Sequence, residues 1–138
     1  MTQEEKQLLI KDICARLPYG LKVKIGEFSD YMLIGIDTTS DKQPLIIKHA
    51  DDIFTCGIGI VKPYLRPMSS MAKEEFDEYM QFIKHSWEGI DKEEDDYYIK
   101  VKDRDVYTDW LLEHHLDYRG LIPIGLALEA PKDMYKTE

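Results

Sequence analysis

The N-terminal segment 2–17 carries apolar residues at helical spacing. Thr2 and Glu5 have the form of a capping box, in which each side chain accepts a hydrogen bond from the other residue's backbone. Pro18 and Gly20 end the pattern. We expect a helix that packs its apolar stripe against a sheet and buries its single cysteine. The stripe consists of Leu9, Ile10, Ile13, Cys14 and Leu17.

The next part of the chain has the pattern of strands joined by short turns. Apolar residues alternate with Lys22 and Lys24 in the first strand, which indicates one buried and one solvated face. A turn is expected at 27–30, before a strand that is apolar on both faces and therefore central. Pro44 opens the third strand, and a bulge or tight turn at Gly57 interrupts the fourth. The predicted strands cover 21–25, 31–36, 44–49 and 53–61.

Two prolines mark the expected end of this sheet. Pro63 and Pro67 bracket a short segment, and proline has no N–H to donate to a ladder. We therefore expect the chain to leave the sheet at Pro63 in an extended form. The strands before it predict a small curled antiparallel sheet, with an SH3-like half-barrel as its specific form.

A second helix is predicted after the sheet. Ser69 and Ser70 are its candidate caps, carboxylates crowd its first turns, and Gly89 ends it. Its apolar positions recur at helical spacing, which favours packing of one face. They are Phe76, Tyr79, Met80, Ile83 and Trp87.

A third helix is predicted near the C-terminus. A solvated acidic loop at 91–96 and a short strand at 97–102 precede it. Asp105 is its candidate cap and Gly120 its expected end. The apolar segment 121–128 then has to be covered, as a helical turn or as an added strand. The stripe of this helix is Tyr107, Trp110, Leu111, His114 and Tyr118.

The length of the chain limits it to one domain. Its 138 residues suffice for a core without metal or disulfide staples, and a hydrophobic content of 43% is typical of globular proteins. Residues 1–70, with one helix and the sheet, and residues 71–138, which are mainly helical, are expected to share one core. The predicted class is α+β.

The charge is unevenly divided along the chain. Lys and Arg number 18 against 27 Asp and Glu, which gives −9 at pH 7. Residues 1–70 carry 9 basic and 9 acidic side chains, so the whole excess lies in 71–138, with 9 basic and 18 acidic. Such a balance opposes binding to phosphate backbones and to anionic lipid surfaces. We expect no direct nucleic-acid binding and no membrane association.

The cysteines and the N-terminus favour a reducing compartment. Cys14 and Cys56 are too few for a disulfide framework or a thiolate zinc site. The N-terminus is polar and acidic, unlike a secretory signal, and the segment 121–128 is far shorter than a membrane span. We expect a cytoplasmic protein. Cys56, beside a glycine, is the cysteine expected to be exposed.

Catalytic and metal-binding motifs are absent from the sequence. It has no Gly-rich phosphate loop followed by Lys, no serine-hydrolase elbow and no zinc motif. His114 and His115 point about 100° apart on a helix and do not converge on one ion, whereas Asp117 is placed to orient the ring of His114. We predict no catalytic residue, no metal ligand and no cofactor.

Two segments combine tight backbone control with recognition side chains. They contain Tyr64 and Arg66 between two prolines, and Tyr118 and Arg119 before a glycine. Tyrosine and arginine are favoured at interfaces because each joins a large contact area to directional hydrogen bonds. These four residues are our candidate partner-binding residues. The alternative is that the tyrosines staple the sheet to the helices and the arginines pair with the acidic half.

The same segments resemble those of a known family. CARLPYG at 14–20, VKPYLRPMSSM at 61–71, and DYRGLIP and GLALEAP within 117–131 look like sequences of an uncharacterised family of short proteins. That family is encoded in Bacteroides-type gut bacteria and in their prophages and mobile elements. The resemblance implies a cytoplasmic location and a mobile-element origin, and it implies no activity.

These observations favour a non-enzymatic interaction or accessory protein that binds a protein partner. Partner binding is expected at the edge or mouth of the sheet and at the Tyr/Arg segments. One alternative is an acidic decoy, in which carboxylates of residues 71–138 imitate DNA phosphates and occupy a DNA-binding enzyme. The other is an enzyme that uses a carboxylate or His114, which requires a concave pocket lined by such groups.

Overall fold

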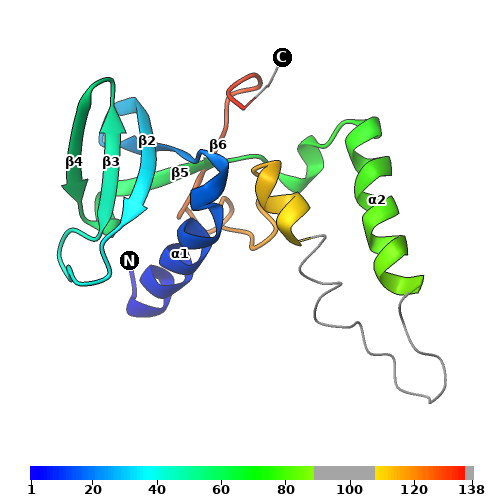
Figure 1. Cartoon of the computed structure of the whole chain (residues 1–138), viewed down its shortest axis with the longest axis horizontal. Helices are drawn as coiled ribbons and strands as arrows, with labels where there is room; N and C mark the ends of the chain where they lie inside the picture. The colour runs from blue at the N-terminus through cyan, green and yellow to red at the C-terminus, as the bar shows by residue number, and fades with distance from the viewer. Residues whose placement is uncertain (89–107, 136–138) are drawn as a thin grey trace.

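The structure is a computed structural model that describes residues 1–88 and 108–135. It consists of an N-terminal helix, a six-stranded sheet and a smaller helical part beside them (Figure 1). The helices are α1 (Gln3–Arg16) and α2 (Lys73–Glu88), and short 3-10 turns are η1 (Leu17–Tyr19), η2 (Ile58–Ile60) and η3 (Met68–Ser70). The strands are β1 (Lys22–Ile25), β2 (Phe28–Ile36), β3 (Leu45–His49), β4 (Asp52–Cys56), β5 (Val61–Leu65) and β6 (Leu128–Glu129).

The sheet confirms the α+β class and corrects the expectation of a purely antiparallel sheet. Its order is β4-β3-β2-β1-β5-β6, so the first four strands form a meander and β5 returns to pair with β1. All neighbouring strands are antiparallel except β5 and β6, which are parallel. The segment 121–128, for which a helical turn or an added strand was expected, forms a series of turns, and only its last residue, Leu128, belongs to β6.

The capping box of α1 is confirmed, but its buried face differs from the predicted stripe. The Thr2 hydroxyl accepts from the Glu5 N–H at 3.1 Å, and the Glu5 carboxylate accepts from the Thr2 N–H at 2.9 Å. The helix is rotated so that Asp12 and Arg16 are buried as an ion pair, and Cys14 is therefore exposed. The four buried residues of the helix are Leu9, Asp12, Ile13 and Arg16.

The hairpins differ from prediction at two points. The turn after β1 is shorter than expected, because Gly26 adopts a φ of 60° and β2 already begins at Phe28. Cys56, expected to be exposed, is the buried end of β4. Five large apolar side chains of β2 and β4 are exposed to solvent. They are Phe28, Met32, Ile34, Ile53 and Phe54.

The sheet continues through the two-proline segment, which corrects the expectation that it ends at Pro63. Val23 of β1 pairs with Pro63 of β5. The missing N–H of this proline is tolerated because β6 pairs only with the two residues after it, Tyr64 and Leu65. The chain therefore leaves the sheet two residues later than predicted.

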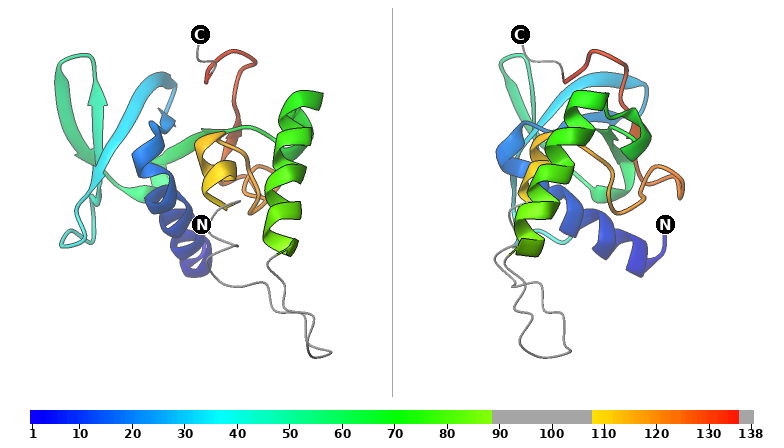
Figure 2. Two further views of the ribbon diagram at one scale, coloured as in Figure 1. Left: turned by 45° about the vertical axis from the view of Figure 1, so that its right-hand side comes forward. Right: turned by 90° about the vertical axis from the view of Figure 1, so that its right-hand side faces the viewer.

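The main core lies between α1 and the concave side of the sheet (Figure 2). Apolar residues of α1 and of the first five strands are joined there by residues from the C-terminal turns. Burial on both sides explains why the sheet and the helix form together. Fully buried members include Leu9, Ile13, Leu21, Val23, Leu45, Ile47, Leu65 and Leu121.

A smaller apolar cluster lies under α2. Trp110 and Leu111, from the helix at 108–113, pack there with Leu116 and with Tyr79 of α2. The cap of α2 is not Ser69 or Ser70, which belong to η3. Instead, the Glu75 carboxylate accepts a hydrogen bond from the Ala72 N–H at 3.1 Å.

The C-terminal helix ends earlier than predicted. It ends at residue 113 because His115 adopts a φ of 60°, in the left-handed region that a continuing helix cannot contain. The chain then turns, and Gly120 lies in these turns rather than at a helix end. The predictions made for Gly89, for the acidic loop 91–96, for the strand 97–102 and for Asp105 lie outside the described residues.

The Tyr135 hydroxyl joins β1 to β5 at the point where backbone pairing between the two strands stops. It accepts from the Lys22 N–H at 2.9 Å and donates to the Tyr64 carbonyl at 2.7 Å. In a continued ladder these two backbone groups would pair with each other. The C-terminal segment therefore contributes one rung of the sheet through a side chain.

Among the described residues, no helix has both the length and the apolar character needed to cross a lipid bilayer.

Replacing Asp12 should destabilise the whole domain. Asp12→Asn leaves the fully buried Arg16 guanidinium without its anion, and the loss of one partner of a buried pair costs about 3 to 5 kcal/mol. Urea unfolding of the variant measures this loss. Glu4→Gln on the exposed side of the same helix is the control and should change the free energy of unfolding by less than about 0.5 kcal/mol. Equal effects of the two changes would contradict the role given to the pair.

Removing the Tyr135 hydroxyl should cost about 2 kcal/mol, because Tyr135→Phe leaves the Lys22 N–H and the Tyr64 carbonyl without this partner. Thermal or urea unfolding measures the effect. Tyr31→Phe is the matched control, since the Tyr31 hydroxyl makes no hydrogen bond to a described residue. A Tyr135→Phe variant as stable as this control would show that the rung contributes nothing.

Candidate functional site

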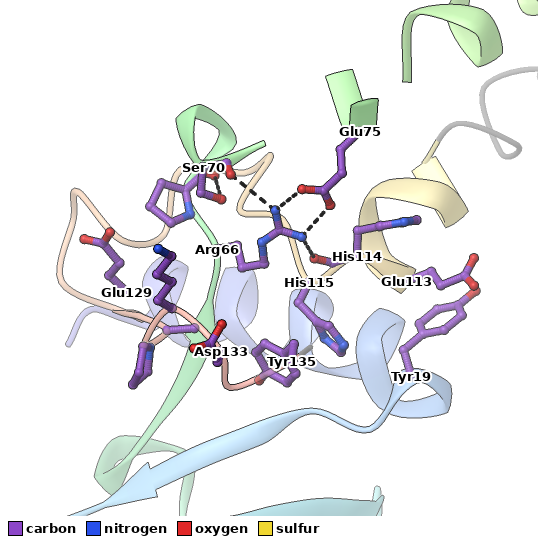
Figure 3. Close-up of a pocket in the computed structure, with 14 residues that line it drawn as sticks. Tyr19, Arg66, Ser70, Glu75, Glu113, His114, His115, Glu129, Asp133 and Tyr135 are labelled. Carbon is purple, nitrogen blue, oxygen red and sulfur yellow. Dashed lines mark hydrogen bonds and ion pairs between the residues drawn. The ribbon is translucent and has the colours of Figure 1, made fainter. Parts of the chain in front are cut away.

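A pocket of about 850 Å³ opens where the end of β5, the helix at 108–113 and the C-terminal segment meet (Figure 3). Its lining comes from Tyr19 and from residues within 66–75, 113–115 and 129–135. These segments are far apart in the sequence. Backbone hydrogen bonds hold them together: the Arg66 N–H donates to the His115 carbonyl at 2.7 Å, and the Ala130 N–H donates to the Leu65 carbonyl at 2.8 Å.

One wall of the pocket is an ion pair between Arg66 and Glu75. The guanidinium donates to both carboxylate oxygens, at 2.7 and 2.8 Å, and also to the carbonyls of His114 and Ser70. These hydrogen bonds from Arg66 are the main reason that the pKa of Glu75 lies below its usual range. The pair ties α2 to the end of β5, and it neutralises the one arginine among the described lining residues.

The two adjacent histidines have different surroundings. His114 stacks on Trp110 with ring centroids 4.0 Å apart, and its Nδ1 lies 2.8 Å from the Trp110 carbonyl oxygen. Asp117, expected to orient that ring, instead accepts from the N–H groups of Leu121 and Ile122. His114 is therefore oriented by its own helix.

His115 forms the floor of the pocket. Its side chain is 8% exposed, its ring stacks on Tyr135 at a centroid distance of 3.6 Å, and its buried Nδ1 has no hydrogen-bond partner among the described residues. Burial, together with the positive charges of Arg16 and Arg66, lowers its pKa from 6.5 to about 4. The imidazole is therefore neutral at pH 7.

The ends of the pocket are acidic. Glu113 lies at one end beside Tyr19, and Glu129 lies at the other (Figure 3). Both carboxylates are exposed, and neither makes an ion pair with a described residue. Burial and the negative charges of Asp109 and Glu113 raise the pKa of Tyr19. The potential at this end of the pocket is thus negative.

Of the four predicted partner-binding residues, only Arg66 belongs to the described lining of the pocket. Arg66 lines the pocket, whereas Tyr64 is 8% exposed, with its carbonyl bound by the Tyr135 hydroxyl. The Arg119 guanidinium donates to the buried carboxylate of Asp12 at 3.1 Å, and it lies over the ring of Tyr118 at 5.0 Å. Their described contacts are therefore within the chain, and their partner-binding role stays a prediction.

The described lining residues form no catalytic constellation. The Ser70 hydroxyl donates to the Pro67 carbonyl at 2.6 Å and has no base beside it. The described residues contain no cluster of three His, Cys, Asp or Glu side chains placed to hold a metal ion. Burial raises the pKa of both thiols, Cys14 and Cys56, and neither lines the pocket. The arrangement is suited to binding a ligand by shape and charge.

Sequence reasoning missed His115 and Tyr135 as members of the site. A histidine one position away from an apolar stripe gave no signal, because its backbone conformation appears only in the folded chain. Tyr135 lies three residues from the end of the chain, where no periodic pattern remains. The one usable signal was that His115 lies three residues before Tyr118, in the second Tyr/Arg segment.

Compared with models of known protein families, with curated proteins and with solved structures, the chain matches none of them. The interpretation of the pocket is therefore based on the residues of this chain alone.

Stability should fall in mild acid because of His115. The unfolded chain binds a proton on this histidine below about pH 6.5, whereas the folded chain binds it only below about 4. The native state is therefore penalised as the pH falls from 6.5 towards 4, by about 2 to 3 kcal/mol at pH 4.5. His115→Asn, which tolerates a positive φ, should lose that much less stability between pH 7 and pH 4.5 in urea titrations. Identical pH profiles for the two proteins would contradict the buried neutral imidazole.

Proposed function

We propose that the chain is a non-enzymatic interaction protein that binds a segment of a protein partner in the pocket beside Arg66. The observation that carries the proposal is the pocket itself, about 850 Å³ in volume and lined by four separate segments. Pockets of this size accommodate several side chains of a partner. The lining mixes aromatic rings with charged groups, as interface hot spots do.

The hydrogen bonds that the lining side chains already make favour binding over catalysis. Both terminal nitrogens of Arg66 already donate to Glu75 and to two carbonyls, and Tyr135 uses its hydroxyl within the sheet. A catalytic group needs a free functional atom within reach of a substrate. His114, the residue named for the enzyme alternative, uses Nδ1 at its own helix and stacks on Trp110.

The finer description of the fold belongs to the same proposal. The order β4-β3-β2-β1-β5, with the turn η2 between β4 and β5, supports an SH3-like arrangement of the first five strands. A cytoplasmic location is supported by two cysteines that are both free. The mobile-element origin rests on the sequence resemblance alone.

The acidic decoy is the competing proposal, and it predicts a different kind of surface. A decoy presents rows of unpaired carboxylates that a basic enzyme reads by charge, and such complexes dissociate in moderate salt. A pocket with aromatic and charged walls predicts a complex that is lost when the cavity is filled, whereas binding to a decoy surface does not depend on the cavity. Filling the cavity therefore separates the two.

Filling the pocket should abolish partner capture. Ala130 lines it and uses only its backbone to pair with Leu65, so Ala130→Phe places a ring in the cavity. Thr38→Phe, in the exposed turn after β2, is the matched control. Each tagged protein is incubated with lysate of the organism that encodes the chain, with and without nuclease, at 0.1 and about 0.5 M salt. Captured proteins are identified by mass spectrometry, and thermal unfolding verifies that both variants are folded.

The proposal expects a protein captured by the wild type and by Thr38→Phe at the lower salt concentration, and at least ten-fold depleted with Ala130→Phe. The purified partner should then bind directly with the same ranking. Capture that Ala130→Phe leaves intact would reject the pocket. Capture of DNA-binding enzymes that Ala130→Phe leaves intact and that the higher salt releases would favour the decoy.

A further inference from the structure

We infer that the pocket binds a cationic side chain, a guanidinium or an alkylammonium, presented by a basic segment of the partner protein. The inference rests on the proposed function, because it assumes that the pocket is the binding site. It adds the chemical class of the ligand and the groups that select it.

The charge of the lining favours a cation. Counting histidines as neutral, the pocket residues include four carboxylates and two cations, Arg66 and Lys132, which gives −2. Arg66 is already neutralised by its bidentate contact with Glu75. Lys132 is then the only cation of the lining whose charge is not balanced by a described ion pair. An anionic ligand would face the carboxylates with little compensation.

The carboxylates at the two ends of the pocket are available to a ligand. Glu113 and Glu129 are exposed and unpaired among the described residues, and the formal charge of −9 adds a long-range attraction for cations. Figure 3 places them at opposite ends of the cavity, so a basic segment that crosses it meets a carboxylate at each end. A single small cation meets only one.

The aromatic lining supplies the second element of cation recognition. Tyr19 lies beside Glu113, and burial, together with the negative charges near it, raises its pKa. A cation between an aromatic face and a carboxylate gains both the cation–π and the ion-pair attraction. A flat guanidinium stacks on such a ring while donating to the carboxylate, so arginine is the side chain that fits best.

The floor of the pocket limits how deep the charge enters. His115 and Tyr135 stack there, and burial is the main reason that the pKa of His115 is lowered and its ring is neutral. A buried neutral floor offers a cation no carboxylate partner, so the charge is held near the acidic ends. The apolar stem of the ligand, and its backbone carbonyls, are the parts expected to face the floor.

Titration of the full chain with defined probes tests the inference. Amide nuclear magnetic resonance spectra of the labelled protein are recorded with acetyl-Gly-Arg-Gly-Arg-Gly-amide, with the same peptide carrying Glu in place of Arg, and with spermidine. The arginine peptide should shift resonances of residues that line the pocket and bind at least five-fold more tightly than spermidine. The glutamate peptide should leave these resonances unchanged.

A charge-matched pair of variants separates the pocket from the general acidity of the chain. Glu113→Gln combined with Glu129→Gln should weaken the arginine peptide at least five-fold. Glu27→Gln combined with Asp41→Asn removes the same charge from exposed turns of the sheet and should weaken it less than two-fold. Equal weakening by both pairs, or tighter binding of the glutamate peptide, would overturn the inference. Tighter binding of spermidine than of the peptide would also overturn it.

Failure of this inference is distinguishable from failure of the proposed function. A partner whose capture is lost with Ala130→Phe but is unaffected by Glu113→Gln combined with Glu129→Gln occupies the pocket without a cation. That result rejects the cationic ligand alone. A partner whose capture Ala130→Phe leaves intact rejects the pocket and the ligand together.

Discussion

A buried ion pair between Asp12 and Arg16 fixes how the two parts of the chain meet. Both side chains are fully buried, with Nε and Oδ2 2.7 Å apart, and removing such charges from water costs several kcal/mol unless every contact is well placed. The remaining contacts come from the other end of the chain. Arg16 donates to the Leu116 carbonyl at 2.7 Å, and Arg119 donates to Asp12 at 3.1 Å. The N-terminal helix is thereby tied to the turn after the last helix.

The pocket follows from this connection. With Leu116 held against α1, the backbone on both sides of it pairs with Arg66 at the end of β5, and His115 is placed over the stacked Tyr135. His115 then adopts a left-handed conformation that a non-glycine residue rarely takes. Strained residues of this kind persist only where the surrounding contacts over-determine them, and they gather at functional sites. The strained residue, His115, is one of the residues that line the pocket.

The charge of the molecule is organised at this site. Three arginines of the lining and of its support, Arg16, Arg66 and Arg119, are each paired with a carboxylate, whereas Glu113 and Glu129 are left to solvent. These arginines therefore serve the architecture, and part of the acidic excess faces the cavity. This division gives a neutral, rigid floor and acidic ends, a combination that selects a ligand by charge at its ends and by shape in between.

The sequence by itself determined the local elements. The capping box of α1, the strands from β1 to β4 and the α+β class follow from periodicity, glycines and prolines, which act over a few residues. It also singled out two segments around Arg66 and Tyr118, which the structure pairs. Tertiary contacts decided the rest: the rotation of α1 that exposes Cys14, the persistence of the sheet through Pro63, the parallel strand β6 and the conformation of His115. Each of these depends on a partner about forty or more residues away, and no local pattern records such a partner.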